Sequence, residues 1–169
     1  MACVIVNDAS CLIDLRKGQL LHAMLSLPDR FVVPFPVRAS ELLDFTPQEW
    51  RLLDDGGVVT FDLPPDAVGE ALQIKAGRPR LSANDCFCLV TTLRHEAVLL
   101  TGDQRLRRIA GDMGVEVHGV LWLHDRLHEA GNNPLDLLVN ALEIWRADPA
   151  VFLPNDEIET RLRLLRRLM

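Results

Sequence analysis

The sequence has no long hydrophobic run, although 49% of its 169 residues are hydrophobic. No apolar segment approaches the roughly 20 residues that a membrane-spanning helix needs. The opening residues, MACVIVNDAS, place no basic segment before the apolar stretch, unlike a secretory signal peptide. Internal repeats and low-complexity stretches are also absent. We therefore expect a soluble, cytoplasmic protein with one substantial core and no membrane partner.

Cysteine is scarce, and no two cysteines form a C-x-x-C pair. That absence argues against a zinc ribbon and against a dithiol redox motif. The four residues lie in apolar surroundings: Cys3, Cys11, Cys86 and Cys88. We expect reduced thiols that pack in the core of a cytosolic protein.

Lysine occurs only as Lys17 and Lys75, so the remaining cations are arginines. The net charge of −6 argues against a surface that is basic everywhere and binds nucleic acid nonspecifically. Arginine, however, forms bidentate contacts with phosphate that lysine does not form. An acidic chain with local arginine clusters can still bind RNA, but only at a defined place.

The order of the segments predicts a parallel α/β fold, because short apolar runs rich in β-branched residues alternate with helical patterns. The expected strands are residues 3–7, 30–34, 58–63, 97–101 and 115–119. The expected helices are residues 9–18, 19–27, 36–45, 46–57, 66–77, 82–96, 102–114, 122–131, 134–148 and 154–169. Residue 155 or 156 is expected to cap the last helix.

Four acidic residues stand where such a fold would form a site. Asp8 and Asp103 follow predicted strands, and ligands of open parallel sheets bind beyond the carboxyl ends of the strands. Glu41 and Asp85 fall on predicted helices beside them, with Glu41 on the middle turn of its helix. Four neighbouring carboxylates repel one another unless a cation lies between them. Oxygen ligands select Mg²⁺ or Mn²⁺.

Each of these acids also has a purely structural interpretation. Asp8 and Asp103 can cap the helices that follow them. Asp85 lies three residues after Ser82 and can form a capping box with it. Glu41 can be a solvated helix residue. Spacing alone leaves both interpretations open.

Three segments together resemble the PIN-domain family. VNDASCLIDL is similar to its opening strand and helix, in which an aspartate ends the strand and a hydroxyl residue follows. VVPFPVRASELL is similar to its second motif, a strand and then a helix with a glutamate. The segment LSANDCFCLVTTLRHEAVLLTGDQRLRRIAGDMGVEVHG is similar to its remaining motifs, including T-x-D at a strand end.

This resemblance implies a three-layer sandwich with a central parallel sheet, formed by residues 1–130. Residues 131–169 are then a C-terminal helical extension packed on the same domain. The resemblance also implies a metal-dependent ribonuclease, often the toxin partner of an antitoxin protein and often a homodimer. The residues that match the metal-binding, catalytic acids are Asp8, Glu41, Asp85 and Asp103, and the auxiliary hydroxyl residues are Ser10 and Thr101.

Two arginine groups border the predicted acids and would hold RNA phosphates, although solvated surface charge explains them about as well. They are Arg78 and Arg80 before Ser82, and Arg105, Arg107 and Arg108 after Asp103. His124 and His128 lie one helical turn apart, but without a third ligand an exposed helix face is the better interpretation.

Two other function classes compete with a nuclease. One is a catalytically silent PIN-like module that binds RNA or protein. The other is a phosphotransfer protein, because Asp8 follows a strand. A dehalogenase-type phosphatase would have a second aspartate where Ser10 stands, and a receiver domain would have a lysine at a late strand end.

Overall fold

The computed structural model describes residues 2–169, which form a sheet of five parallel strands. The strands are β1 (Val4–Asn7), β2 (Arg30–Pro34), β3 (Val59–Phe61), β4 (Val98–Leu100) and β5 (Val117–His118). Their order in the sheet is β3-β2-β1-β4-β5. The side chains of β4 and most of β1 are buried, as expected for strands covered on both faces. The predicted parallel α/β fold is therefore confirmed.

Helices connect the strands and continue beyond the sheet. They are α1 (Ala9–Lys17), α2 (Leu21–Met24), α3 (Phe35–Ser40), α4 (Pro47–Asp55), α5 (Pro65–Gly77), α6 (Ala83–Arg94), α7 (Gln104–Asp112), α8 (Val120–Ala130), α9 (Leu135–Ala147) and α10 (Asn155–Leu168). None of these helices is both long and apolar enough to cross a membrane.

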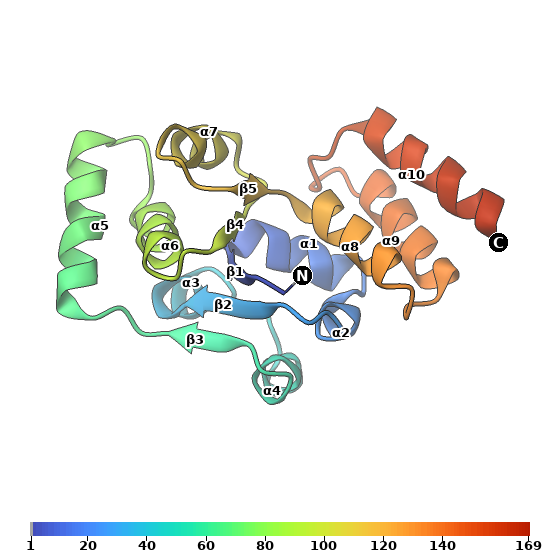
Figure 1. The fold of residues 1–169 in the computed structure, drawn as a ribbon, viewed down its shortest axis with the longest axis horizontal. Coiled ribbons are helices and arrows are strands. Elements are labelled where there is room, and N and C mark those ends of the chain that lie inside the picture. The colour runs from blue at the N-terminus through green and yellow to red at the C-terminus, as the bar shows by residue number, and fades with distance from the viewer. Residues whose placement is uncertain (1) are drawn as a thin grey trace.

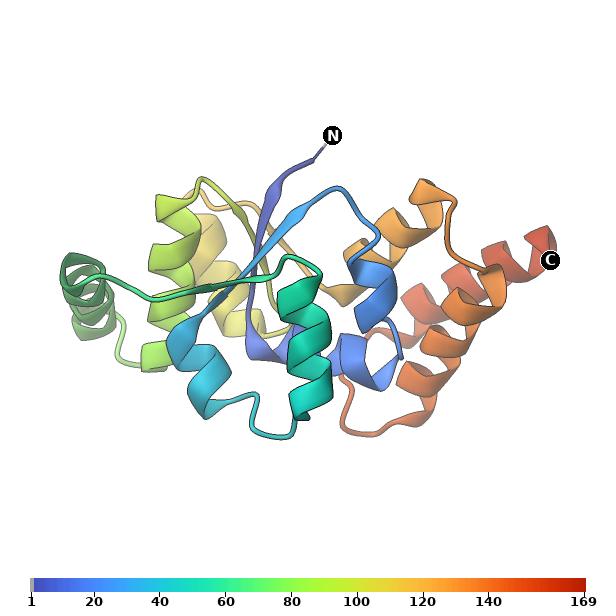
Figure 2. The same cartoon turned by 90° about the horizontal axis from the view of Figure 1, so that it is seen from below.

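The helices form a layer on each side of the sheet. Figure 1 shows α5, α6 and α7 on one side, and α1, α2 and α8 on the other. Seen from below, α5 lies at one end of the molecule and the C-terminal helices lie at the opposite end (Figure 2). Crossovers between parallel strands are right-handed, so the face on which the connecting helices pack depends on the direction in which the chain moves along the sheet. From β1 the chain moves one way to β2 and β3, and it then returns to the other side of β1 to form β4 and β5. The strand order therefore reverses between the neighbouring strands β1 and β4.

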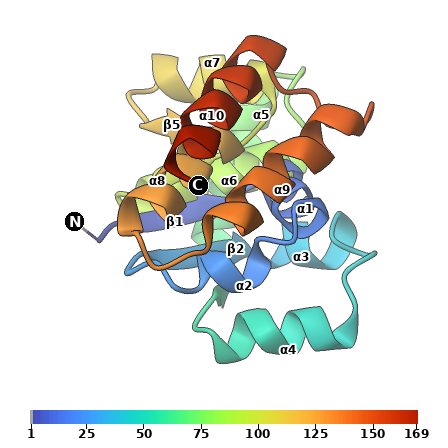
Figure 3. The same ribbon diagram turned by 90° about the vertical axis from the view of Figure 1, so that its right-hand side faces the viewer.

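The C-terminal helices pack on the same layer as α1. α9 contacts α1 and α8, and α10 contacts α9 (Figure 3). Trp145 of α9 is 1% exposed, and its indole Nε1 donates a 2.7 Å hydrogen bond to the carbonyl oxygen of Asp14. α8 ends at Ala130 and is followed by Gly131, whose φ of 70° is the left-handed conformation that glycine adopts without strain.

Three local predictions were wrong. The helix predicted at 19–27 is one short helix, α2, followed by turns. The helix predicted at 36–45 ends at Ser40, well before the extended Thr46, which precedes Pro47 and caps α4 with its side chain. The residue that precedes α10 is Pro154, without a side-chain cap. Because α3 ends at Ser40, Glu41 lies just after this helix and not on its middle turn.

Candidate active site

Asp8 occupies the centre of the carboxyl edge of the sheet. It follows β1, and its backbone N–H donates a 3.0 Å hydrogen bond to the carbonyl oxygen of Leu100 at the end of β4. Its side chain caps α1, because Oδ1 accepts a 2.8 Å hydrogen bond from the N–H of Ala9. The residue is only 6% exposed. Asp8 therefore lies at the reversal point of the sheet, where open α/β proteins bind ligands.

Two hydroxyl groups hold the other carboxylate oxygen of Asp8. Thr101 Oγ1 donates to Asp8 Oδ2 at 2.7 Å, and Ser10 Oγ donates to the same atom at 3.1 Å. Both hydroxyls also accept: Ser10 from the N–H of Gly102 at 3.0 Å, and Thr101 from the N–H of Asp103 at 3.1 Å. The network ties the end of β1 to the loop after β4.

Asp85 and Asp103 both cap helices with one carboxylate oxygen. Asp85 Oδ2 accepts from the N–H of Ser82 at 2.7 Å, and Ser82 Oγ accepts from the N–H of Asp85 at 3.0 Å, which completes a capping box. Asp103 Oδ1 accepts from the N–H of Leu106 at 2.8 Å. The remaining oxygen of each has no hydrogen-bond partner among residues 2–169. Capping therefore leaves one oxygen of each carboxylate free to bind a ligand.

The structure brings the four predicted acids around one pocket of about 410 Å³. Its lining consists of Asp8, Ala9, Ser10, Ile13, Glu41, Asp85 and Asp103. Glu41 reaches it from the end of α3, which shows that a helical position was not needed for convergence.

The pocket disfavours negative charge. Burial raises the pKa of Asp8 despite the hydrogen bonds from Thr101, Ala9 and Ser10, and the charge of Asp85 adds to the shift. Burial also raises the pKa of Glu41, as does the charge of Asp8. A cation between these groups would stabilise their ionised forms.

The donor set suits a hard divalent cation, because the ionisable side chains of the pocket carry oxygen alone. Within residues 2–169, no three acidic, imidazole or thiol side chains surround one point closely enough to hold an ion. Mg²⁺, however, commonly keeps several water ligands and binds one or two carboxylates directly. The pocket therefore fits an ion bound in part through water.

One residue near the pocket was not predicted from the sequence. The amide of Asn84 donates a 2.8 Å hydrogen bond to Ser40 Oγ. Hydrogen bonding between the side chains of Asn84 and Glu41 lowers the pKa of Glu41 and so opposes the effect of burial. Asn84 joins the start of α6 to the end of α3. Its position directly before Asp85 in the sequence could have indicated that it lies near the pocket.

The predicted RNA-binding arginines lie outside the acidic pocket. Arg78 and Arg80 are exposed in the segment between α5 and α6, and Arg108 is exposed on α7. Arg105 donates a 3.0 Å hydrogen bond to the carbonyl oxygen of Arg80, so the two predicted groups meet. A role in phosphate binding stays a prediction.

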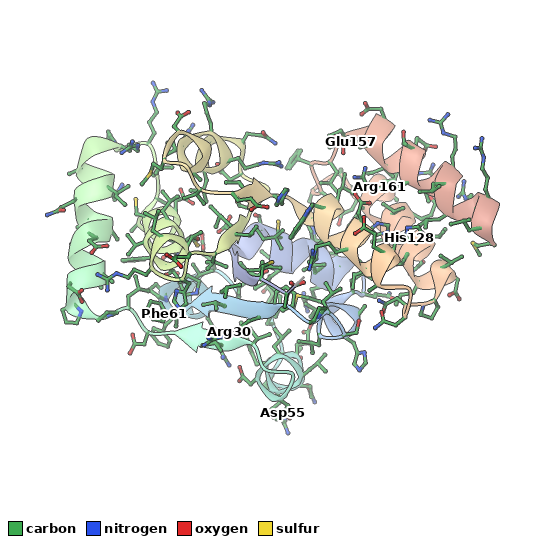
Figure 4. All side chains as sticks on the ribbon, in the orientation of Figure 1. Arg30, Asp55, Phe61, His128, Glu157 and Arg161 are labelled. Carbon is green, nitrogen blue, oxygen red and sulfur yellow. The ribbon has the colours of Figure 1, made fainter. Side chains whose placement is uncertain are left out.

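The prediction that both histidines lie on an exposed helix face was wrong for His124. This side chain is 1% exposed because α9 covers it, and its Nε2 lies 3.1 Å from the carbonyl oxygen of Leu138. His128, labelled in Figure 4, is half-buried on the next turn. The four cysteines are free thiols, and all except the half-buried Cys3 are buried, in keeping with the prediction.

Fold and pocket together define a class: a parallel α/β protein with a carboxylate-lined pocket at the reversal point of its sheet. The family model DUF3368, a PIN domain, matches residues 4–167. The chain belongs to the PIN-domain family, whose members are generally nucleases, typically use divalent metals and commonly bind RNA. The match includes α9 and all but the last residue of α10.

Comparison with solved structures gives the same fold. The chain is similar to PAE2754 from Pyrobaculum aerophilum, with a TM-score of 0.52 and 19% sequence identity. The match covers 76% of this chain and 99% of that chain. A comparison with curated proteins found no match.

Proposed function

We propose that this protein is an endoribonuclease that hydrolyses RNA phosphodiester bonds with Mg²⁺ or Mn²⁺. The observation that carries the proposal is one pocket that four carboxylates line, among them the buried Asp8. The residues that would hold the ion are Asp8, Glu41, Asp85 and Asp103. When bound, such an ion supplies charge neutralisation and a bound water of lowered pKa.

The side chains have distinct parts in this proposal. Ser10 and Thr101 hold the carboxylate of Asp8 in one orientation, because both donate to Oδ2. Asp85 and Asp103 are fixed at helix starts and each present one free oxygen. The arginines of the segment before α6 and of α7 would bind phosphates along the RNA strand; we propose Arg78, Arg80, Arg105 and Arg108 for this role.

The test is cleavage of an end-labelled RNA by protein first stripped of metal. We expect products only after Mg²⁺ or Mn²⁺ is added, and we expect them to disappear with excess chelator. Asp8→Asn removes one charge while keeping the shape of the side chain, and it should reduce the rate by orders of magnitude. Full cleavage in chelator, by protein free of contaminating nuclease, would contradict the proposal.

A second candidate is a PIN-like module that binds RNA or protein without cleaving it. The observation that favours it is that no three of the acids, among the residues described, already surround one point. RNA binding without any cleavage across a range of Mn²⁺ concentrations would select this candidate.

Narrower hypotheses follow from the family resemblance: a cytoplasmic location, a toxin role with an antitoxin partner, and a homodimer. Induced expression should then arrest growth, and Asp8→Asn should abolish the arrest.

Exposed apolar side chains such as Leu72 and Leu164 are compatible with a second copy of the chain in a homodimer. Light scattering at micromolar concentration should give twice the 19.0 kDa chain mass, and a monomer mass would contradict the dimer.

A further inference from the structure

A second, larger hollow adjoins the acidic pocket. Its volume is about 660 Å³, and it lies between α1, the start of α8 and the segment leading into α10. Ser10 and Ile13 line both this groove and the acidic pocket. The two hollows are therefore neighbours that meet at Ser10 and Ile13, and a chain molecule that crosses the acidic pocket can extend towards the groove.

The groove offers apolar and aromatic surface. Ile13, Leu121 and Leu153 line it, together with Phe152. Phe152 is 89% exposed, the most exposed of the large apolar side chains among residues 2–169. An aromatic ring on the rim of a hollow of this size provides a stacking face for a planar group, and small-molecule sites have comparable volumes.

Most of the charges in the groove are already neutralised. Arg161 donates to both carboxylate oxygens of Asp125, at 2.8 and 2.7 Å, and contacts Glu157 at 3.2 Å. Figure 4 shows Glu157 and Arg161 on the first turns of α10. Lys17 pairs with Asp148 at 3.2 Å. These cations are engaged within the protein and offer little to a phosphate.

Arg107 differs from the other cations of the groove. It is half-buried on α7, and no acidic side chain among residues 2–169 pairs with it. A Cβ atom on Gly119 would lie only 3.1 Å from Arg107 Nη1, so the guanidinium lies close against the glycine backbone. The groove thus combines an apolar wall with one guanidinium that has no counter-charge.

We propose that this groove binds the nucleotide next to the scissile phosphate of a single-stranded RNA, with its base on Phe152 and a phosphate on Arg107. The proposal rests on the proposed ribonuclease function. A base paired in a duplex would not have a free face, whereas an unpaired base stacks on aromatic rings and its phosphate binds arginine. The C-terminal segment that carries Phe152 is then part of the substrate site.

Binding of a short fluorescent single-stranded RNA, measured by anisotropy in chelator, tests the groove without cleavage. Loss of one stacked base weakens binding by about 5- to 100-fold, so we expect a loss in that range for Phe152→Leu and near-normal affinity for Phe152→Trp. Arg107→Gln should weaken binding and reduce its salt dependence. Two control variants outside the groove, Leu93→Ala and Arg30→Gln, should leave affinity unchanged; both residues are exposed, Leu93 near the end of α6 and Arg30 at the start of β2, and neither lines the groove.

A series of RNAs, each with one abasic position, locates the base. In the wild type, one abasic position should reduce affinity as much as Phe152→Leu does, and the two changes together should cause no further loss. Unchanged RNA affinity in Phe152→Leu and Arg107→Gln would overturn the subsite. The groove would then be a binding site for a protein segment and not for RNA. A wild type that neither binds RNA in chelator nor cleaves it with Mg²⁺ or Mn²⁺ would overturn the proposed function as well, so the two failures are distinguishable.

Discussion

The hydroxyl of Thr101 donates a 2.7 Å hydrogen bond to the carboxylate of Asp8 and joins the end of β4 to the end of β1. Thr101 is fully buried and Asp8 is 6% exposed. A carboxylate in such surroundings depends on its donors to remain ionised. The contact therefore controls both the orientation and the charge of the acid at the centre of the pocket.

Thr101→Val tests this relationship, because it keeps the shape of the side chain and removes the donor. We expect cleavage to fall by about 10- to 100-fold, as with other groups that orient metal ligands, and the free energy of unfolding to fall by about 1–3 kcal/mol. Thr101→Ser keeps the hydroxyl and should retain most activity. Equal activity in the valine and serine variants would show that the hydrogen bond does not matter.

Asp85→Asn separates the two roles of this acid. Its capping oxygen is retained, but a charge is removed beside Asp8 and Glu41. We expect cleavage to fall by orders of magnitude, while the metal-free protein becomes slightly more stable because repulsion is relieved. Ser82→Ala is the matched control: it should cost about 1 kcal/mol of stability and little activity. Normal cleavage with a lower melting temperature in Asp85→Asn would favour capping alone.

Asp14 should make stability depend on pH. Burial raises its pKa from the usual 3.8 to about 6; Lys17 opposes the shift and Asp148 adds to it. Because the folded state binds the proton more tightly, the free energy of unfolding should fall as pH rises from 3.8 to about 6.

Asp14→Asn should remove this pH dependence and stabilise the protein at pH 7 by about 1 kcal/mol after allowance for solvent screening. Urea unfolding at several pH values measures both effects. Asp55→Asn, at an exposed position on α4 (Figure 4), should change stability by less than about 0.5 kcal/mol. A pH profile that is the same in wild type and Asp14→Asn would contradict the assignment.

Arg126 should be a major contributor to stability. It contacts both carboxylate oxygens of Asp29 at 2.7 and 2.6 Å, and the side chain of Asp29 is 0% exposed. Arg126→Ala leaves that carboxylate without its cation and should cost about 3–5 kcal/mol in urea unfolding. Asp54→Ala removes a more exposed pair with Arg38 and should cost roughly 1 kcal/mol or less. Similar losses in both variants would show that burial of the pair is unimportant.

Local pattern was sufficient for the order of strands and helices. Apolar runs such as that of β1 mark strands buried on both faces, and Ser82 with Asp85 marks the start of α6. The same local logic failed for α3, where Leu42 and Phe45 continue the apolar pattern but are buried from a turn instead of a helix. Periodicity records which residues are buried, and a turn can bury them as well as a helix can.

By itself the sequence determined the parallel α/β fold through local pattern, and its resemblance to the PIN-domain family singled out the four acids. Only the tertiary structure placed Asp8, Glu41, Asp85 and Asp103 around one pocket, since they come from four different elements and meet through the strand order. It also decided that His124 is buried and that Phe152 borders a groove beside the acids. Those features depend on where α9 and the segment before α10 pack, and no local spacing encodes the position of a helix against a distant neighbour.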